Sequence, residues 1–102
     1  MTVLFADAGG DRVAVLAAAV AEVVPAVRLH ASPGGPVMRY RGSVVPVVEL
    51  ARPTPRLSAR VVVIRHAGRV FGLRVDRVGE LRELAGDPGA LVHARHHGDD
   101  HR

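Results

Sequence analysis

The sequence predicts a mainly β protein, and three observations lead to this fold class. Valine is concentrated in short runs, most densely in Val44–Val48 and Val61–Val63. β-branched side chains favour an extended backbone, because they fit a pleated, buried surface better than a helix. Glycine and proline clusters separate the runs, and short strands between such turn signals are typical of a small barrel or sandwich. The 102 residues are expected to form one domain, or two very small subdomains that share a core.

The N-terminal quarter of the chain is expected to begin with a hairpin. Val3–Ala8 is predicted to be a strand, Gly9-Gly10-Asp11 a tight turn, and Arg12–Leu16 the returning strand. The next segment, Ala17–Val24, leaves two alternatives open, because its alanines favour a short helix and its valines favour a third strand. Pro25 ends any helix that forms there.

The block Tyr40–Leu50, with the sequence YRGSVVPVVEL, is the most informative part of the chain. Its valines predict a strand, and Gly42 indicates a tight turn or a close backbone approach just before it. Pro46 removes one hydrogen-bond donor from the ladder, which predicts an edge strand or a bulge. Proline and glycine predict loops on both sides of the block, over Ala31–Pro36 and Arg52–Ser58.

A second hairpin and one further strand are expected after this loop. Arg60–His66 is predicted to be a strand buried on both faces, and Ala67-Gly68 a two-residue turn. Arg69–Val75 returns, and Asp76–Leu84 forms the last strand. Alternation in the returning strand predicts one face with Val70, Gly72 and Arg74, and an opposite face with Phe71, Leu73 and Val75. We expect a folded domain over residues 1–86 and a flexible, histidine-rich tail over residues 87–102.

Composition excludes several kinds of site. The chain has no cysteine, which excludes disulfides, thiolate zinc sites and a cysteine nucleophile. Only three residues are aromatic, so the core must consist of valine, leucine and alanine. No signal peptide is recognisable, and no apolar run reaches the roughly 18–20 residues that a membrane helix needs. We therefore expect a cytoplasmic protein with no direct membrane insertion.

The basic charge has two interpretations. The formal net charge is +4, and every one of the 14 basic residues is arginine. Arginine without lysine is what a GC-rich genome produces, and this is the favoured interpretation. The alternative is a small basic β-barrel that binds nucleic acid. Because the arginines are spread along the chain and few aromatic side chains are available for base stacking, we expect no nucleic acid as a partner.

No constellation of residues indicates an enzyme or a cofactor. The chain lacks a nucleophile elbow, a Walker-type phosphate loop and a dinucleotide fingerprint. The tail carries imidazoles and carboxylates that could hold a divalent metal adventitiously, at His93, His96, His97, Asp99, Asp100 and His101. A flexible terminus does not supply the supporting shell of a structural metal site, so no metal site is predicted. His30 and His66 are expected to be solvated.

Four segments, taken in order, resemble the CheW-like adaptor domains of bacterial chemosensory systems. They are Val20-Ala21-Glu22-Val23, Ser32–Pro36, Arg41–Leu50 with R-G-x-V-x-P-V-x-E-L, and Gly72–Asp76 with G-L-x-V-D. The resemblance covers residues 3–84. It implies a pair of small β-barrel subdomains around a shared hydrophobic core, and no catalysis. It also identifies Gly42, Pro46, Gly72 and Asp76 as residues of the structural motif.

The resemblance implies a scaffold that joins transmembrane chemoreceptors to a CheA-type histidine kinase. In the family the receptor binds in a groove between the subdomains. Carried over to this chain, the candidate partner-binding residues are Val20, Glu22, Arg41 and Val45. An alternative for Arg41 is an internal ion pair with Glu22 or Glu49.

The chain also departs from the family pattern. Residues are missing before Arg41-Gly42, and the C-terminal part that completes the second barrel has no counterpart, which implies an incomplete second barrel. An incomplete barrel leaves an open strand edge, and open edges tend to pair. We therefore expect a homo-oligomer or strand exchange through this edge. A methyl-accepting chemoreceptor is the expected partner, and the resemblance leaves open whether the kinase is still bound.

Overall fold

The structure, a computed structural model, describes residues 1–26, 29–50 and 59–85. These residues form nine strands and one short 3-10 helix, which confirms the mainly β prediction. The elements are β1 (Thr2–Ala8), β2 (Asp11–Leu16), η1 (Ala17–Ala19), β3 (Val20–Pro25), β4 (Leu29–His30), β5 (Val37–Tyr40), β6 (Ser43–Glu49), β7 (Arg60–His66), β8 (Arg69–Val75) and β9 (Arg77–Glu83). No helix in this part of the chain is long and apolar enough to cross a membrane.

The segment with two open alternatives contains both structures. Ala17–Ala19 forms the single turn of η1, and β3 begins immediately afterwards at Val20. The predicted loop over Arg52–Ser58 and the predicted tail after residue 86 lie outside the described residues.

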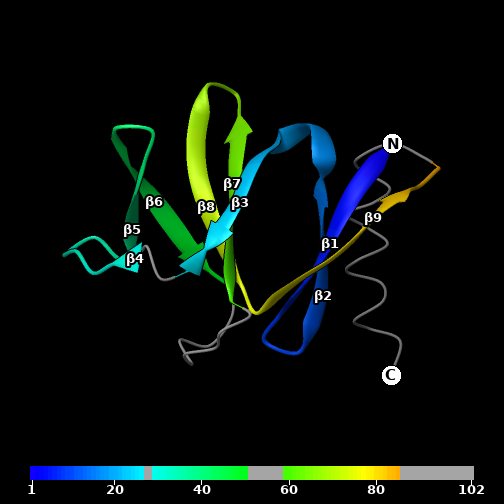
Figure 1. Cartoon of the computed structure of the whole chain (residues 1–102), viewed down its shortest axis with the longest axis horizontal. Coiled ribbons are helices and arrows are strands. Elements are labelled where there is room, and N and C mark those ends of the chain that lie inside the picture. The colour runs from blue at the N-terminus through cyan, green and yellow to red at the C-terminus, as the bar shows by residue number, and fades with distance from the viewer. Residues whose placement is uncertain (27–28, 51–58, 86–102) are drawn as a thin grey trace.

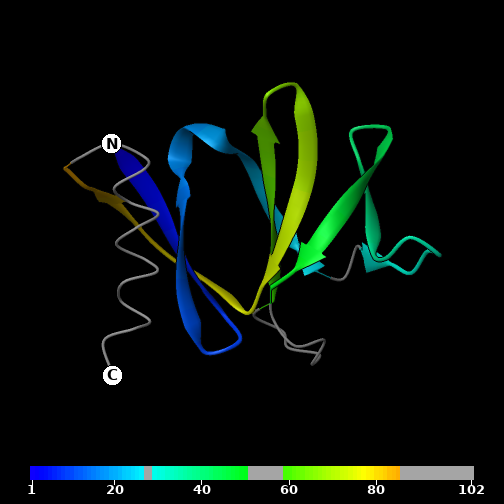
Figure 2. The same cartoon turned by 180° about the vertical axis from the view of Figure 1, so that it is seen from behind.

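The strands form two sheets. The smaller has three strands in the order β2-β1-β9, and the larger has six in the order β3-β7-β8-β6-β5-β4. Figure 1 shows β1, β2 and β9 on one side of the molecule and β4, β5 and β6 on the other, with β7 and β8 between them. The view from behind in Figure 2 gives the same arrangement. The β7–β8 hairpin therefore lies between the two parts of the fold.

Three hairpins are closed by two-residue turns in which both residues have positive φ. They are Gly9-Gly10 between β1 and β2, Arg41-Gly42 between β5 and β6, and Ala67-Gly68 between β7 and β8. Turns of this kind match the right-handed twist of the paired strands. Each of the three has glycine in second position, where a side chain would be strained.

The hydrophobic core consists of two clusters that share the strand β7. One cluster contains Val62 and Ile64 together with inward residues of β1 and β2, and the other contains Val61 and Val63 together with residues of β3, β5 and β6. Consecutive side chains of a strand point to opposite faces, so a strand between two cores must be apolar throughout. The prediction that Arg60–His66 is buried on both faces is confirmed for Val61–Ile64.

The larger sheet curls around the second cluster. Val24 comes from one end of this sheet, and Met38 and Tyr40 come from near its other end, yet all three belong to the same cluster. Gly72 permits the close packing inside the curl, because a Cβ built on it would lie 2.6 Å from Cγ1 of Val61. The predicted alternation in Arg69–Val75 is confirmed, with Phe71, Leu73 and Val75 on the first cluster.

The prediction that Pro46 marks an edge strand or a bulge is wrong. β6 lies between β5 and β8 in the sheet, and its register with β5 has no shift. The proline is accommodated because the two neighbours pair with different halves of β6. Pairing with β5 extends from Ser43 to Pro46, and parallel pairing with β8 begins at Val47.

Backbone geometry explains why the missing donor is harmless. The N–H of Val47 donates to the carbonyl oxygen of Pro36 at 3.0 Å, so Val47 is in a hydrogen-bonded position of the ladder with β5. Positions alternate along an antiparallel ladder, and the nitrogen of Pro46 therefore points away from β5. On that side pairing with β8 has not yet begun, so no hydrogen bond is lost.

Candidate functional site

Arg41 lies at the tip of the β5–β6 hairpin with its side chain in solvent. Its φ is +50°, a left-handed conformation that the two-residue turn imposes. The Nε–H donates to the hydroxyl oxygen of Tyr40 at 3.1 Å, and the guanidinium carbon lies 5.4 Å from the centre of the Tyr40 ring. These contacts hold the base of the side chain, while 72% of it remains exposed.

Glu22 is directed toward Arg41 by a bulge in β3. Val20 is paired with Ile64 and Glu22 with Val63, so the register shifts between these two positions. In a regular strand residues two apart share a face, but here Val20 packs on the first cluster, whereas Glu22 is paired with Val63 of the second. One extra residue in β3 therefore places the carboxylate beside the hairpin tip.

Arg41 and Glu22 link two distant parts of the curled sheet. Nη2 of Arg41 lies 3.9 Å from Oε1 of Glu22, and the two side chains are 72% and 46% exposed. β3 and β5 are separated by three strands in the sheet, so this ion pair bridges the mouth of the curl. An exposed pair contributes only about 0–1 kcal/mol to stability, which leaves the arginine available to other acceptors.

Of the two valines among the candidate partner-binding residues, Val45 lies in the core and Val20 packs against its margin. Val45 is 5% exposed and belongs to the second cluster, and Val20 is half-buried against the first. The structure therefore brings Glu22 and Arg41 together on the surface, whereas Val45 lies in the second cluster and Val20 lies against the first. The alternative pairing of Arg41 with Glu49 is not found, because Glu49 lies 3.8 Å from the buried Arg74.

The residues of the structural motif have local roles in the fold. Gly42 has φ +81° in the β5–β6 turn, and Gly72 gives space to Val61. Asp76 accepts a hydrogen bond from the N–H of Gly9 at 2.9 Å through Oδ2, and its own N–H donates to the carbonyl oxygen of Asp7 at 2.8 Å. Asp76 thus connects the β1–β2 turn to the junction of β8 and β9.

Sequence reasoning missed the apolar residues that face outward on β6. Val44 and Val48 are 64% and 47% exposed, whereas Val45 and Val47 are buried. Alternation within the valine run carried this information, because neighbouring residues of a strand point to opposite faces. Which face points outward depends on the hairpin with β5, and this could not be seen in the valines alone.

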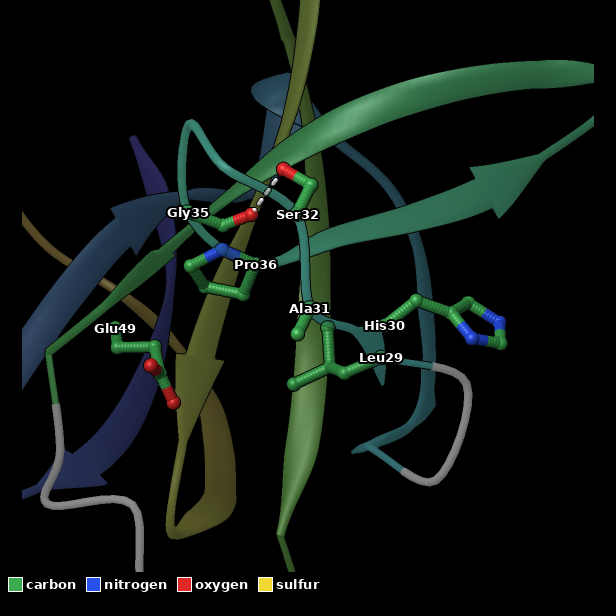
Figure 3. A pocket seen from close by; sticks show the side chains of 7 residues that line it. All are labelled: Leu29, His30, Ala31, Ser32, Gly35, Pro36 and Glu49. Atoms are coloured by element: carbon green, nitrogen blue, oxygen red, sulfur yellow. Dashed lines mark hydrogen bonds between the residues drawn. The ribbon is translucent and has the colours of Figure 1, made fainter.

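A shallow cavity of about 320 Å³ lies between the Ala31–Pro36 loop and the end of β6 (Figure 3). The loop is held by a hydrogen bond from Oγ of Ser32 to the carbonyl oxygen of Gly35 at 2.5 Å. Figure 3 shows the ring of His30 pointing away from the carboxylate of Glu49, so these two groups do not form an acid–base pair. Among the described residues that line this cavity, no nucleophile and base are in contact.

No metal-binding cluster is found within residues 1–26, 29–50 and 59–85, where no three His, Asp or Glu side chains converge. His30 and His66 are exposed, as expected. The tail residues with metal-binding potential, His93, His96, His97, Asp99, Asp100 and His101, are outside the part that the structure describes.

Comparison with known proteins identifies the family and the fold. The sequence pattern of the CheW-like domain matches residues 2–88. The fold is similar to that of the scaffolding protein TtCheW from Thermoanaerobacter tengcongensis, with a TM-score of 0.72 and 20% sequence identity. The match covers 82% of this chain and 62% of that chain, so this chain spans less than two thirds of the solved protein. No curated protein sequence matches the chain.

Proposed function

The chain belongs to the CheW-like domain family, and on this premise we propose that it is a non-catalytic scaffolding adaptor in a bacterial chemosensory system. It binds the cytoplasmic tips of methyl-accepting chemoreceptors and modulates their coupling to a CheA-type histidine kinase. Its place of action is the cytoplasm, where the receptor tips lie. The similarity to a solved scaffolding protein supports this proposal at the level of the fold.

The observation that carries the proposal is the exposed pair of Arg41 and Glu22 at the mouth of the larger sheet. The Arg41 guanidinium is held at its base by Tyr40, and its outer donors face solvent. A planar guanidinium offers several N–H donors in a fixed arrangement, which suits recognition of carboxylates and carbonyl oxygens on a helix. Glu22 provides an acceptor beside it, so the pair can exchange its weak internal contact for contacts with a receptor helix.

Exposed valines supply the apolar part of the proposed receptor-binding surface. Val44 follows the β5–β6 turn on β6 and is 64% exposed, and Val48 lies on the same outward face of β6 and is 47% exposed. Val45 lies in the second cluster and Val20 lies against the first, and we propose that they support the shape of the binding region. Apolar contacts beside a charged pair are typical of surfaces that bind one face of an amphipathic helix.

Nucleic-acid binding has less support than receptor binding. Among the residues that the structure describes, arginines within 4.0 Å of a carboxylate oxygen include Arg12, Arg41, Arg74, Arg77 and Arg82. Arginines paired in this way present less positive field to a phosphate backbone than unpaired ones would.

The test is a binding titration of the purified chain with a chemoreceptor signalling tip. We expect Arg41→Ala to weaken binding at least about tenfold, because a charged hydrogen-bonding group is lost from the interface. Arg69→Ala is the matched control, since Arg69 is an exposed arginine beside the β7–β8 turn. Thermal unfolding of both variants verifies that the fold is intact.

The outcomes separate the parts of the proposal. No binding of the unmodified chain to receptor tips would refute the adaptor function. Equal binding by Arg41→Ala and the unmodified chain would remove Arg41 from the interface. A parallel titration with the regulatory domain of the kinase determines whether the chain also contacts the kinase directly.

A further inference from the structure

The outer edge of β9 is a feature that the proposed function does not use. Within the described residues β9 pairs with β1 on one side, and no strand pairs with its other side. An edge strand exposes backbone N–H and C=O groups that can pair with another chain. β9 also carries Leu81, which is 64% exposed between the charged residues Glu80 and Arg82.

Hydrogen bonds at the end of the ladder show which residues of β9 face outward. The N–H of Leu84 donates to the carbonyl oxygen of Met1 at 2.7 Å, and the carbonyl oxygen of Leu84 accepts from the amino group of Met1 at 3.0 Å. Hydrogen-bonded positions alternate along an antiparallel ladder. Since Thr2 is paired with Glu83, Val3 with Arg82 and Leu4 with Leu81, the backbone groups of Leu81 and Glu83 point to the outer edge.

The residues around Leu81 are complementary to themselves in an antiparallel arrangement. We propose that the outer edge of β9 pairs with the same edge of a second copy of this chain, with a two-fold axis at Leu81. Leu81 then lies opposite Leu81 of the second copy, and Glu80 lies opposite Arg82 of the second copy. Within one chain Arg82 already lies 3.2 Å from Glu80, an exposed contact of about 0–1 kcal/mol that leaves both charges available. The symmetry repeats the Glu–Arg pair between the copies, so one register adds two cross-strand opposite-charge pairs around an apolar centre.

Neighbouring registers are less favourable. An axis at Glu80 places two glutamates directly opposite each other, and an axis at Arg82 places two arginines directly opposite each other. Like charges directly opposite each other destabilise paired strands. The order of charge, leucine and opposite charge therefore selects Leu81 as the centre.

The pairing is expected to be weak and to leave the receptor-binding surface free. The register of β9 with β1 shifts between Leu4 and Ala6, and such an irregularity limits the straight part of the edge to a few residues. Interfaces below about 1,200 Å² in total are typical of transient complexes. β9 belongs to the smaller sheet, and Figure 1 shows it on the other side of the molecule from β5 and β6.

Charge reversal tests the register directly. Sedimentation velocity of the full chain over a range of concentrations should show a monomer–dimer equilibrium. Glu80→Arg alone places two arginines opposite each other at both pairs, and Arg82→Glu alone places two glutamates there. We expect each variant to dimerise about tenfold more weakly. An equimolar mixture of the two variants should dimerise again, because every cross-strand pair is once more Glu opposite Arg.

Arg69→Glu reverses a charge on the β7–β8 hairpin and should leave the dimer unchanged, and thermal unfolding verifies that each variant folds. Leu81→Asp is a second variant that should abolish the dimer, since it places two carboxylates at the centre. A chain that remains monomeric at millimolar concentration, or a mixture no more dimeric than its components, would overturn the proposal. Amide exchange protection of Leu81 in the monomer would also overturn it, since the edge would then be covered within one chain.

Discussion

Gly72 offers the sharpest test of how the two cores share β7 and β8. A Cβ at this position would lie 2.6 Å from Cγ1 of Val61 and 3.3 Å from Cγ2 of Val47. Carbon atoms in contact normally lie about 3.5–4.0 Å apart, so the new methyl group overlaps Val61 by about 1 Å. Val61 is fully buried and β-branched, which leaves it little freedom to move aside.

The expected effect of Gly72→Ala is a net loss of stability. Overpacking a close-packed core costs about 1–3 kcal/mol. Replacing glycine also makes the unfolded chain less flexible, which returns about 0.4–1 kcal/mol. The overlap is the larger effect, so we expect a net loss of about 1–2 kcal/mol. For a domain of this size that lowers Tm by about 4–16 °C.

The measurement is urea and thermal unfolding of Gly72→Ala beside Gly34→Ala. Gly34 is the matched control, because a Cβ there would meet nothing within 4 Å. The control should be unchanged or slightly more stable. Val61→Ala removes the atom that is overlapped, so the double variant should lose less stability than the sum of the two single losses. If Gly72→Ala were as stable as Gly34→Ala, the close packing of β8 on β7 would be refuted.

Two further predictions concern the carboxylate of Glu83 on β9 and the proline of β6. Hydrogen bonds from the amino group of Met1 and from Thr2 hold the pKa of Glu83 below its usual value, so the stability that they supply is present above about pH 4.5 and is lost as the pH falls through the lowered pKa. Between neutral and acidic pH, the Tm of Glu83→Gln should therefore fall less than the Tm of the unmodified chain. An equal fall of Tm in both proteins would contradict this assignment. Pro46→Val should change the free energy of unfolding by no more than about 1 kcal/mol, because its nitrogen faces no partner strand. Val45→Pro should lower the free energy of unfolding much more, since Val45 occupies a hydrogen-bonded position opposite Met38 and proline has no N–H to donate. Equal urea midpoints for Pro46→Val and Val45→Pro would show that this ladder register is wrong.

Much of the fold could be predicted from local patterns. The run Val61–Ile64 predicted a strand between two apolar layers, and both clusters draw on it. Alternation in Arg69–Val75 assigned Phe71, Leu73 and Val75 to one face. These patterns are reliable because strand periodicity and turn chemistry depend on residues that are close together in the sequence.

The candidate site was less predictable than the fold. Arg41 and Glu22 could each be identified as candidate residues. Their contact depends on a bulge in β3, and no single residue of β3 indicates that bulge in the sequence. Val45 was expected at a partner surface and lies in the core. The exposed face of β6 belongs to Val44 and Val48, because pairing with β5 determines which way the alternating side chains point.

The sequence by itself determined the mainly β fold, the positions of the hairpin turns, the strand that serves two cores and the resemblance to the CheW-like family. Only the tertiary structure decided that β6 has neighbours on both sides, that Glu22 meets Arg41, and that Leu81 lies at an outer edge. Strand propensity and turn geometry arise from neighbouring residues, whereas these three features depend on register between strands that are distant in the chain. A shift of one residue in such a register moves every side chain to the other face, and the local sequence does not contain that information.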